Sequence, residues 1–499
     1  MQEETRAIMS GLVGDGALLL STPFQSTLFV PPFSELNIFA WQMDGDTILF
    51  DTFARFSSFA ARNEISLRID KEQITQFLAS DRMNTKQTVF SGLVEIEHGC
   101  SLTVLADDRG ASLVEVNHLP DLLCERSLTP MSGSDAAEEI RALTLEAIQF
   151  KASHDTVGIA TSGGFDSSLI ALLYGRAFPE KALHLYHVYS SRVRGLNEIE
   201  YFNDVRQRLS SHVTWLDAET TRDVQLDFPN MAPGFRPHMV AGWYERNWKM
   251  YAAAKQDGVS VILNGDGGDQ LMLCLDEMSL AREFHKEGTP LLRSVVNEAI
   301  LKQSSVWQVT HNWLAGKSDD YMSKWIHFDA DNIEKVKPFL KLKALFPRRI
   351  FRDADRYENL SVSRQHQVCT LNDAKYNSLA AALGVCERKP FLYWPLVRFC
   401  VLCPRQILLA GGRERGLFRS AFSDTLPRSI ANRVGKSGDV DVVQLFDYAT
   451  VKKRVLASHT LADYIELDAV STIDPHNLTD EIAGFLMRCA TVDAYLKTI

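Results

Sequence analysis

From about residue 133 the sequence alternates short apolar runs with longer amphipathic stretches. Such alternation predicts βαβ units that assemble a parallel sheet. Ligands of parallel sheets bind outside the carboxyl ends of the strands, so the residues that follow each strand are the first place to look for chemistry. Ser134 or Asp135 is expected to cap the first helix. The strands are expected within residues 155–162, 182–190, 212–218 and 259–269, and the helices within 132–153, 167–178, 197–211 and 243–258.

A different pattern precedes this region. Short apolar runs separated by Gly, Asp and Asn predict an antiparallel β domain, with strands within residues 18–24, 26–30, 36–41, 47–51, 65–69 and 93–105. One helix is expected over 71–80, capped by Asp70. A polar, proline-containing connector follows, and helical patterns dominate toward the end of the chain. We therefore expect a smaller β domain at 1–120, a linker at 121–132 and an α/β domain at 133–499.

The composition argues against several classes of protein. The 499 residues carry a formal net charge of −10, and 45% of them are hydrophobic. This is ordinary for a globular chain and gives no electrostatic footprint for nucleic acid or an anionic membrane. No run reaches the roughly 18 apolar residues of a membrane helix, and the first residues are acidic where a secretory signal is basic. We expect a cytoplasmic protein with no nucleic-acid or membrane partner.

The eight cysteines are scattered along the chain, which is not the pattern of a disulfide scaffold. Cys400 and Cys403 form a lone CxxC within the apolar run FCVLCP, with no second pair and no histidine nearby. Zinc binding by this pair is therefore disfavoured. Both side chains are expected to be buried as small hydrophobic groups.

The first strand of the predicted parallel sheet runs directly into the turn SGGFDSS at residues 162–168. Gly163 and Gly164 allow the backbone to come close to a ligand, and Ser162 and Ser167 supply hydroxyl groups. The helix that follows points its free N–H groups at the turn, which makes the turn a candidate anion site. The turn lacks the lysine of a Walker loop and the GxGxxG of a dinucleotide site. A plain capped glycine turn remains the alternative.

Asp166 stands inside this candidate anion site, where its charge would repel a phosphate unless a divalent cation lay between them. Mg²⁺ is typically held by one or two carboxylates together with phosphate oxygens. A second glycine-rich turn, with Gly265, Asp266 and Asp269, follows another predicted strand of the same sheet. The two turns together predict a phosphate site bridged by a metal ion.

Four ordered motifs resemble one known family. Residues 162–168 match the SGGxDS signature of the pyrophosphate loop of ATP pyrophosphatases, and within that group the chain resembles the asparagine synthetase family. Residues 263–270 (LNGDGGDQ) are similar to that family's LSGEGxDE. Residues 384–392 (GVCERKPFL) are similar to its GVExRxPFLD, and residues 426–436 (LPRSIANRVGK) to its LPxxIxxRxKK. The resemblance covers nearly the whole chain.

This resemblance implies an α/β fold: an adenine-nucleotide α-hydrolase-like synthetase domain with a helical C-terminal part, preceded by a glutaminase-like β domain. It also implies ATP as substrate and Mg²⁺ as cofactor, with Asp166 and Asp269 as metal ligands. The residues that it implies as binding ATP and pyrophosphate are Ile159, Ser162, Gly163, Gly164, Asp166, Ser167, Ser168, Gly265 and Asp266.

Two further residues receive catalytic roles from the resemblance. Lys436 takes the position of the lysine that stabilises charge on the α-phosphate and on the tetrahedral intermediate. Cys386 stands where the family has a glutamate, so the acid that assists amine deprotonation is either Glu387, one position along, or absent from this segment. Tyr393 and Trp394 replace the aspartate expected after PFL, and core packing is the preferred explanation for them.

The N-terminal region lacks the family's glutaminase nucleophile. Residue 2 is Gln2, and no cysteine occurs before Cys100. A nucleophile needs a reactive, positioned thiolate. The region therefore resembles a shortened relic of that domain, which implies that the amine comes from elsewhere.

Two branches of the family form amides without their own ammonia source: β-lactam synthetases and lasso-peptide cyclases. The chain looks most like the second branch, which joins a peptide's N-terminal amine to an Asp or Glu side chain by way of an adenylate. The implied partners are a precursor peptide, a leader-peptide protease and a leader-recognition protein. Asparagine synthesis from free ammonia, another small-molecule amide ligase, or an inactive peptide- or nucleotide-binding scaffold are the alternatives.

Overall fold

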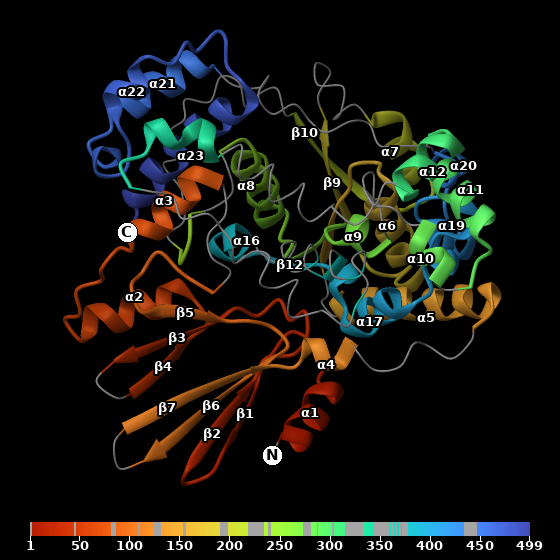
Figure 1. Cartoon of the computed structure of the whole chain (residues 1–499), viewed down its shortest axis with the longest axis horizontal. Helices are drawn as coiled ribbons and strands as arrows, with labels where there is room; N and C mark the ends of the chain where they lie inside the picture. Colours follow the sequence, from red (N-terminus) through yellow and green to blue (C-terminus); the bar gives the residue numbers. More distant parts are fainter. Residues whose placement is uncertain are drawn as a thin grey trace.

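The N-terminal strands and the parallel sheet occupy different sides of the molecule in the computed structural model (Figure 1). The residues described are 2–43, 46–80, 86–107, 110–123, 131–152, 156–189, 198–217, 234–237, 241–272, 281–286, 288–301, 304–314, 333–342, 360, 364, 367–368, 371, 378–433 and 447–499.

The parallel sheet has five strands in the order β10-β9-β8-β11-β12, and every neighbouring pair is parallel. The sequence pattern predicted four of these strands, and the fifth, β12, comes from the third motif. The order reverses direction between β8 and β11. In a doubly wound sheet this is the switch point, outside which ligands bind. The strands are β8 (Val157–Ala160), β9 (Leu183–Tyr189), β10 (His212–Asp217), β11 (Val261–Leu263) and β12 (Cys386–Arg388).

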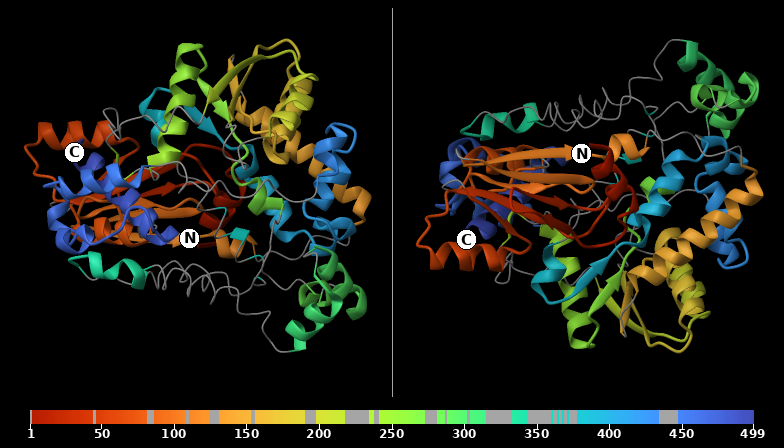
Figure 2. Two further views of the ribbon diagram at one scale, coloured as in Figure 1. Left: turned by 90° about the horizontal axis from the view of Figure 1, so that it is seen from above. Right: turned by 90° about the horizontal axis from the view of Figure 1, so that it is seen from below.

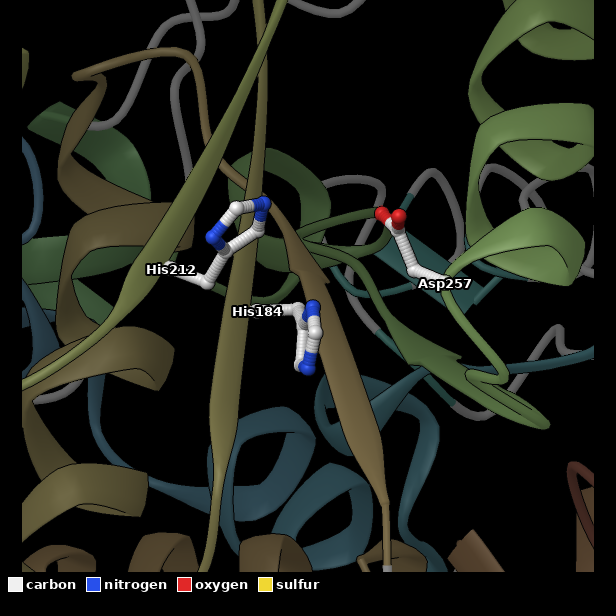
Figure 3. A group of neighbouring side chains, drawn as sticks. All are labelled: His184, His212 and Asp257. Atoms are coloured by element: carbon white, nitrogen blue, oxygen red, sulfur yellow. The ribbon is translucent and has the colours of Figure 1, made fainter.

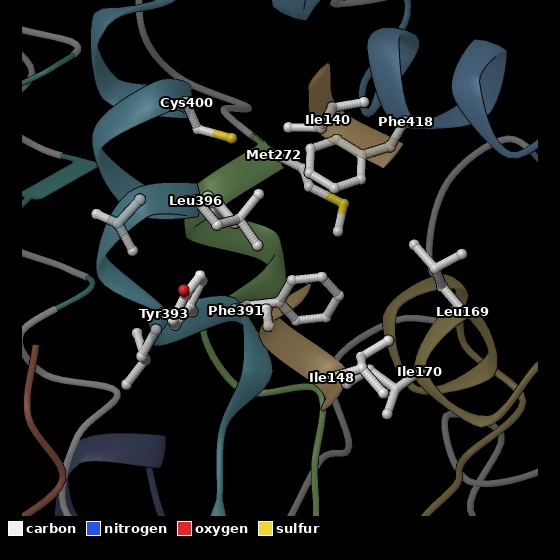
Figure 4. Close-up of a cluster of buried hydrophobic side chains, with 14 of the residues drawn as sticks. Ile140, Ile148, Leu169, Ile170, Met272, Phe391, Tyr393, Leu396, Cys400 and Phe418 are labelled. Carbon is white, nitrogen blue, oxygen red and sulfur yellow. The ribbon is translucent and has the colours of Figure 1, made fainter. Parts of the chain in front are cut away.

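One large hydrophobic cluster joins the sheet to its helices (Figure 4). Side chains from α5 (Gly133–Lys151), α6 (Phe165–Ala177), α9 (Gly268–Met272), α17 (Trp394–Leu402) and α19 (Gly416–Ala421) meet there. Cys400 and Cys403 are fully buried, as expected for small hydrophobic groups. The cap of α5 differs from the prediction: Ser132 accepts from the Asp135 N–H and the Asp135 carboxylate accepts from the Ser132 N–H, which satisfies two free amides.

The N-terminal region forms two antiparallel sheets, one of order β1-β2-β6-β7 and one of order β4-β3-β5. The helix expected over 71–80 is present as α3, and its Asp70 carboxylate accepts from the Glu72 N–H at 2.9 Å. The strands are β1 (Leu18–Ser21), β2 (Gln25–Phe29), β3 (Ile38–Met43), β4 (Asp46–Phe50), β5 (Leu93–Ile96), β6 (Cys100–Asp107) and β7 (Gly110–Asn117).

Two details of this region differ from the sequence prediction. Residues 65–69 form no strand and contribute only an isolated bridge between Ile69 and Phe90. Residues 53–62 form a helix that was not predicted, α2 (Phe53–Arg62). Thr52 caps this helix, and Phe56 and Ala60 bury one face of it. The apolar residues Phe53, Phe56 and Ala60 recur at helical spacing, so a local signal for this helix was present.

The C-terminal helices lie against the N-terminal region in both views of Figure 2. Arg488, from α23 (Asp480–Leu496), donates to the carbonyl oxygens of Leu78 at 2.7 Å and Ala79 at 3.3 Å, at the end of α3 (Lys71–Ser80). The C-terminal helix is therefore joined to the N-terminal region by direct contacts. Within the described residues, no helix combines the length and apolarity needed to cross a membrane.

The remaining helices are α1 (Gln2–Gly11), α4 (Leu119–Leu123), α7 (Ile199–Arg206), α8 (Ala241–Gln256), α10 (Ala281–Lys286), α11 (Leu291–Leu301), α12 (Val306–Leu314), α16 (Ser378–Ala382), α18 (Arg405–Leu408), α20 (Arg428–Ala431), α21 (Tyr448–Leu456) and α22 (Leu467–Ser471), with 3₁₀ turns at η4 (Lys337–Phe339), η5 (Pro390–Leu392), η6 (Ala410–Gly412) and η8 (Leu461–Asp463).

Candidate active site

The two glycine-rich turns touch each other at the switch point. Strands β8 and β11 pair in register, with Ile159 opposite Leu263, so the turn after each strand leaves the sheet at the same edge. A Cβ on Gly268 would lie 2.7 Å from Cγ of Asp166, and this space is open only to glycine. The glycine at position 268 therefore allows the second turn to pack directly against the first.

The first turn leads into the N-terminus of α6. Gly163 has φ +91°, and a Cβ there would lie 2.8 Å from the carbonyl oxygen of Glu198, so only glycine fits. The Gly164 N–H donates to Ser162 Oγ at 3.1 Å, and Ser162 and Ser167 exchange a hydroxyl hydrogen bond at 3.3 Å. Gly164 is the N-cap and provides no side-chain cap, which leaves the first amides of α6 directed at the turn.

Two predicted nucleotide-binding residues lie deeper than this turn. Ile159 is fully buried within the hydrophobic cluster of the sheet. Ser168 is also fully buried, and among the described residues its Oγ has no hydrogen-bond partner. A direct side-chain contact with ATP stays a prediction for both residues.

The carboxylates of Asp166 and Asp269 converge on a single cation, the guanidinium of Arg415. Arg415 Nε lies 3.0 Å from Asp166 Oδ1, and its Nη2 lies 3.1 Å from Asp166 Oδ2. The same Nη2 contacts Oδ1 of Asp269. Two carboxylates that share one guanidinium can also share one divalent cation, and oxygen ligands are those that Mg²⁺ prefers. These side chains therefore fit the metal that the sequence predicted.

Sequence reasoning missed Arg415. Its side chain is nearly buried and lies over the ring of Phe165, with Cζ 5.5 Å from the ring centroid. It is separated from Asp166 by 249 residues, so no local spacing points to the pair. The one local signal is its position within GGRERG at residues 411–416, where Arg415 adopts a left-handed φ of 58°. A non-glycine residue in that conformation is uncommon and marks a constrained site.

Glu387 lies in a buried polar cluster beside the second turn. Tyr251 Oη donates to Glu387 Oε1 at 2.6 Å, and Asn264 Nδ2 donates to the same oxygen. Lys389 Nζ lies 3.4 Å from Glu387 Oε2 and 3.8 Å from Asp266 Oδ2. Because the Asp266 side chain is 58% exposed, the cluster reaches the surface at the predicted pyrophosphate turn.

The charges in this cluster shift each other's pKa. Burial raises the pKa of Glu387, and the Asp266 carboxylate raises it further, against the opposing effect of Lys389. Burial by itself would lower the pKa of Lys389, but the Glu387 and Asp266 carboxylates outweigh burial, and the pKa of this amine lies above its usual value. A buried carboxyl with a raised pKa beside a cleft is a candidate acid or base.

The opposite face of β12 belongs to a second ionic cluster. Arg388 Nη1 lies 2.9 Å from Asp15 Oδ2, and Lys151 Nζ lies 2.7 Å from both Asp15 Oδ2 and Glu35 Oε1. Cys386 is half-buried near these charges, and burial raises the pKa of its thiol. Since side chains alternate along a strand, Cys386 and Arg388 face the N-terminal region while Glu387 faces the turn. This favours Glu387 over Cys386 as the residue closest to the predicted site.

Three other predicted positions have separate outcomes. Lys436 lies outside the described residues. Tyr393 and Trp394 are buried, and Tyr393 Oη donates to Glu146 Oε1 at 2.7 Å. Trp394 stacks on Phe33 with ring centroids 6.1 Å apart. Both side chains therefore pack in the core, as the sequence suggested.

A family model described as asparagine synthase matches residues 139–480. No curated protein matches the chain. The matched segment contains every described turn and strand of the site, from β8 and α6 through β12 to α19.

Proposed function

This chain belongs to the asparagine synthase family, and from that premise we propose that it is a macrolactam synthetase that joins a peptide's N-terminal amine to an Asp or Glu side chain of the same peptide. The family makes the chain an ATP-dependent amide ligase. The identity of the acid and the amine, and the release of AMP, are the parts that we propose.

The observation that carries the proposal is the convergence of Asp166 and Asp269 at the switch point of the sheet. They come from turns that follow two neighbouring strands, and they meet one cationic group. Beside them, the N-terminus of α6 and the hydroxyls of Ser162 and Ser167 offer donors to phosphate oxygens. A site of this kind suits the pyrophosphate part of ATP.

In the proposed reaction the peptide carboxylate attacks the α-phosphorus of ATP. The bond between the α-phosphorus and the bridging oxygen breaks, and pyrophosphate leaves with that electron pair. Ser162, Gly163, Gly164 and Ser167 would bind this leaving group. Asp166 and Asp269 would hold Mg²⁺, which when bound neutralises phosphate charge. Gly265 keeps the second turn close to Ser167, since a Cβ there would lie 3.1 Å from the Ser167 amide nitrogen.

In the second step the amine attacks the acyl carbon of the adenylate and AMP leaves. The amine must lose a proton, and ionised Glu387, next to Asp266, is the proposed acceptor. Lys436 is proposed to stabilise the developing negative charge, by analogy with the lysine of the family's last motif. The peptide product is lighter than its precursor by one water, and ATP becomes AMP and pyrophosphate.

The N-terminal region supports an amine source other than glutamine. Cys100 is the first cysteine of the sequence, and its side chain is fully buried. Burial and the nearby Glu115 and Glu97 carboxylates raise the pKa of its thiol well above the usual value. A thiol of this kind is inert as a nucleophile. The proposal therefore assigns the amine to the peptide substrate, with a leader-peptide protease and a leader-recognition protein as proposed partners.

Mass spectrometry of the full chain with ATP, Mg²⁺ and candidate precursor peptides tests the proposal. We expect a product lighter by one water, and we expect Asp166→Ala to abolish it. The exposed Asp468 provides a matched control, since Asp468→Ala should keep full activity. Exchange of pyrophosphate into ATP that requires only aspartate would instead favour asparagine synthesis from free ammonia. Full product formation by Asp166→Ala would overturn the site assignment.

A further inference from the structure

Three potential metal ligands meet at the amino-terminal edge of the parallel sheet, opposite the candidate active site (Figure 3). His184 lies at the start of β9, and His212 opens β10 directly beside it in the parallel register. Asp257 follows the last residue of α8 and precedes β11. The predicted nucleotide turns leave the carboxyl ends of β8 and β11, at the opposite edge of the same sheet, so this group is separate from them.

The ligand atoms are close enough to share one ion. A nitrogen of each imidazole and one Asp257 oxygen all lie within 4.8 Å of one another. Three atoms so spaced share a point no farther than about 2.8 Å from each, and Zn²⁺ takes His nitrogen at about 2.0–2.1 Å and carboxylate oxygen at about 2.0–2.2 Å. His212 and Asp257 are exposed, so their side chains have room to move the ligand atoms closer to the ion.

The neighbours of Asp257 hold it in this arrangement. Tyr186 Oη donates to Asp257 Oδ2 at 3.0 Å, and Thr214 Oγ1 donates to the same oxygen at 3.2 Å. Hydroxyl groups that orient a carboxylate in this way are typical of the surroundings of a bound metal. Among the described residues, Nδ1 of His184 is buried without a hydrogen-bond partner. A buried nitrogen without a partner costs free energy, which a metal ligand bond would recover.

Among the described residues, a second cluster of potential metal ligands already contains a lysine. Glu97 and Glu115 lie near Cys100, but Lys86 Nζ stands 3.4 Å from Glu97 Oε2 and 2.9 Å from Glu115 Oε2. An ion there would compete with the lysine. No lysine or arginine is paired with His184, His212 or Asp257 in any ion pair among the described residues.

We propose that His184, His212 and Asp257 bind one Zn²⁺ ion, with water as the fourth ligand. Two imidazoles and one carboxylate suit Zn²⁺, whereas Mg²⁺ prefers oxygen ligands alone. The ion would tie β9, β10 and the turn before β11 together at the edge of the sheet remote from the chemistry. Its binding does not depend on the proposed reaction.

Calorimetric titration of the chelator-treated full chain with Zn²⁺, without nucleotide or Mg²⁺, tests the site. We expect one Zn²⁺ per chain, a rise in the melting temperature on binding, and strong visible absorption when Co²⁺ replaces Zn²⁺. The double variant His184→Ala with His212→Ala should lose the stoichiometric binding. Thr214→Val, which removes one support of Asp257, should weaken binding about tenfold. His459→Ala changes an exposed histidine elsewhere and should bind as the unchanged chain does.

Failure of the unchanged chain to take up Zn²⁺ would overturn the proposal, as would equal uptake by the double variant, because the ion would then be bound elsewhere. Circular dichroism of the metal-free proteins checks folding. If the double variant does not fold, His212→Gln alone provides the test, because the side chain is exposed and its loss leaves no buried group unpaired. Its affinity for Zn²⁺ should fall at least tenfold, and an unchanged affinity would contradict the site.

Discussion

Two ionic clusters can be compared, because in each of them carboxylates from distant segments meet one cation. In the first, Asp15 and Glu35 surround Lys151, with side-chain exposures of 9%, 7% and 2%. In the second, Asp166 and Asp269 surround Arg415, and the Asp269 side chain is 31% exposed. The ionic groups are of the same kind, but the first cluster is closed to solvent and the second opens onto the predicted nucleotide turns.

The closed cluster joins the N-terminal region to the strand that carries Glu387. Glu35 Oε1 accepts both from Lys151 Nζ at 2.7 Å and from the backbone N–H of Lys389 at 2.8 Å. Asp15 accepts from Lys151 and from Arg388. The N-terminal region thus holds β12 in place. The first cluster is buried, so it serves as a fixed structural contact. The second is partly exposed, so a ligand can exchange with its cation.

The largest expected effect comes from breaking the closed cluster. Lys151→Met keeps much of the side-chain volume but leaves two buried carboxylates without their central cation. Because removal of one partner from a buried ion pair is strongly destabilising, we expect the free energy of unfolding to fall by about 3–5 kcal/mol. Denaturant titration measures this, with Lys453→Met on an exposed part of α21 as the control. A decrease of less than about 1 kcal/mol in the free energy of unfolding would show that the cluster does not hold the N-terminal region to β12.

Glu387→Gln tests the proposed proton acceptor, a buried carboxyl that lies beside the open cluster. Loss of a positioned base typically costs about 10²–10⁴-fold, so we expect amide formation to slow at least about 100-fold while pyrophosphate exchange changes little. Burial raises the pKa of Glu387, and only the ionised form accepts a proton. The wild-type rate of amide formation should therefore fall as the pH drops through that raised pKa.

The pH series distinguishes this role from a structural one. In the Gln variant the acidic fall in rate should be absent from the residual activity. Because the pKa of Glu387 is higher in the folded than in the unfolded chain, its contribution to wild-type stability decreases as pH rises from the ordinary carboxyl pKa through the raised one. The variant should lack that decrease. Equal slowing of exchange and amide formation would contradict the assignment.

Arg415→Gln tests whether a divalent cation competes with Arg415 for the carboxylates of Asp166 and Asp269. Without the guanidinium, a divalent ion no longer competes with Arg415 for the oxygens of Asp166 and Asp269. We expect the dissociation constant for Mg²⁺ in the absence of nucleotide to fall about tenfold, equivalent to about 1.4 kcal/mol. Calorimetry measures it. An unchanged constant would show that Arg415 and Mg²⁺ do not compete.

The smallest effect is expected for an ion pair on the surface, which sets the baseline for both clusters. Lys335 Nζ lies 2.6 Å from Glu481 Oε1, and the hydrogen bonds of Lys335 and Thr479 lower the pKa of Glu481 to about 2. The stabilisation is present above the ordinary carboxyl pKa and is lost as the pH falls toward about 2. Since the Lys335 side chain is 50% exposed, Lys335→Ala should lower the free energy of unfolding by less than about 1 kcal/mol at neutral pH. A larger loss in denaturant titration would contradict the contrast between this pair and the closed cluster.

The parallel sheet was predictable because its signals are local. The alternation of strands and helices, and the glycines at 163, 164 and 265, follow from backbone requirements that neighbouring residues express. The same local reading failed at α2, where the apolar residues face a sheet formed by segments elsewhere in the chain. It also placed the cap of α5 two or three residues too late, because Ser132 and Asp135 satisfy each other's amides.

The sequence alone determined the fold class, the two glycine-rich turns and the carboxylates that they carry, because each depends on residues close together along the chain. Only the tertiary structure decided that Arg415 joins Asp166 to Asp269, that Tyr251 and Lys389 surround Glu387, and that Glu35 reaches β12. The physical reason is that burial and ion pairing depend on which distant side chains share a small volume, and no local period in the sequence encodes that proximity.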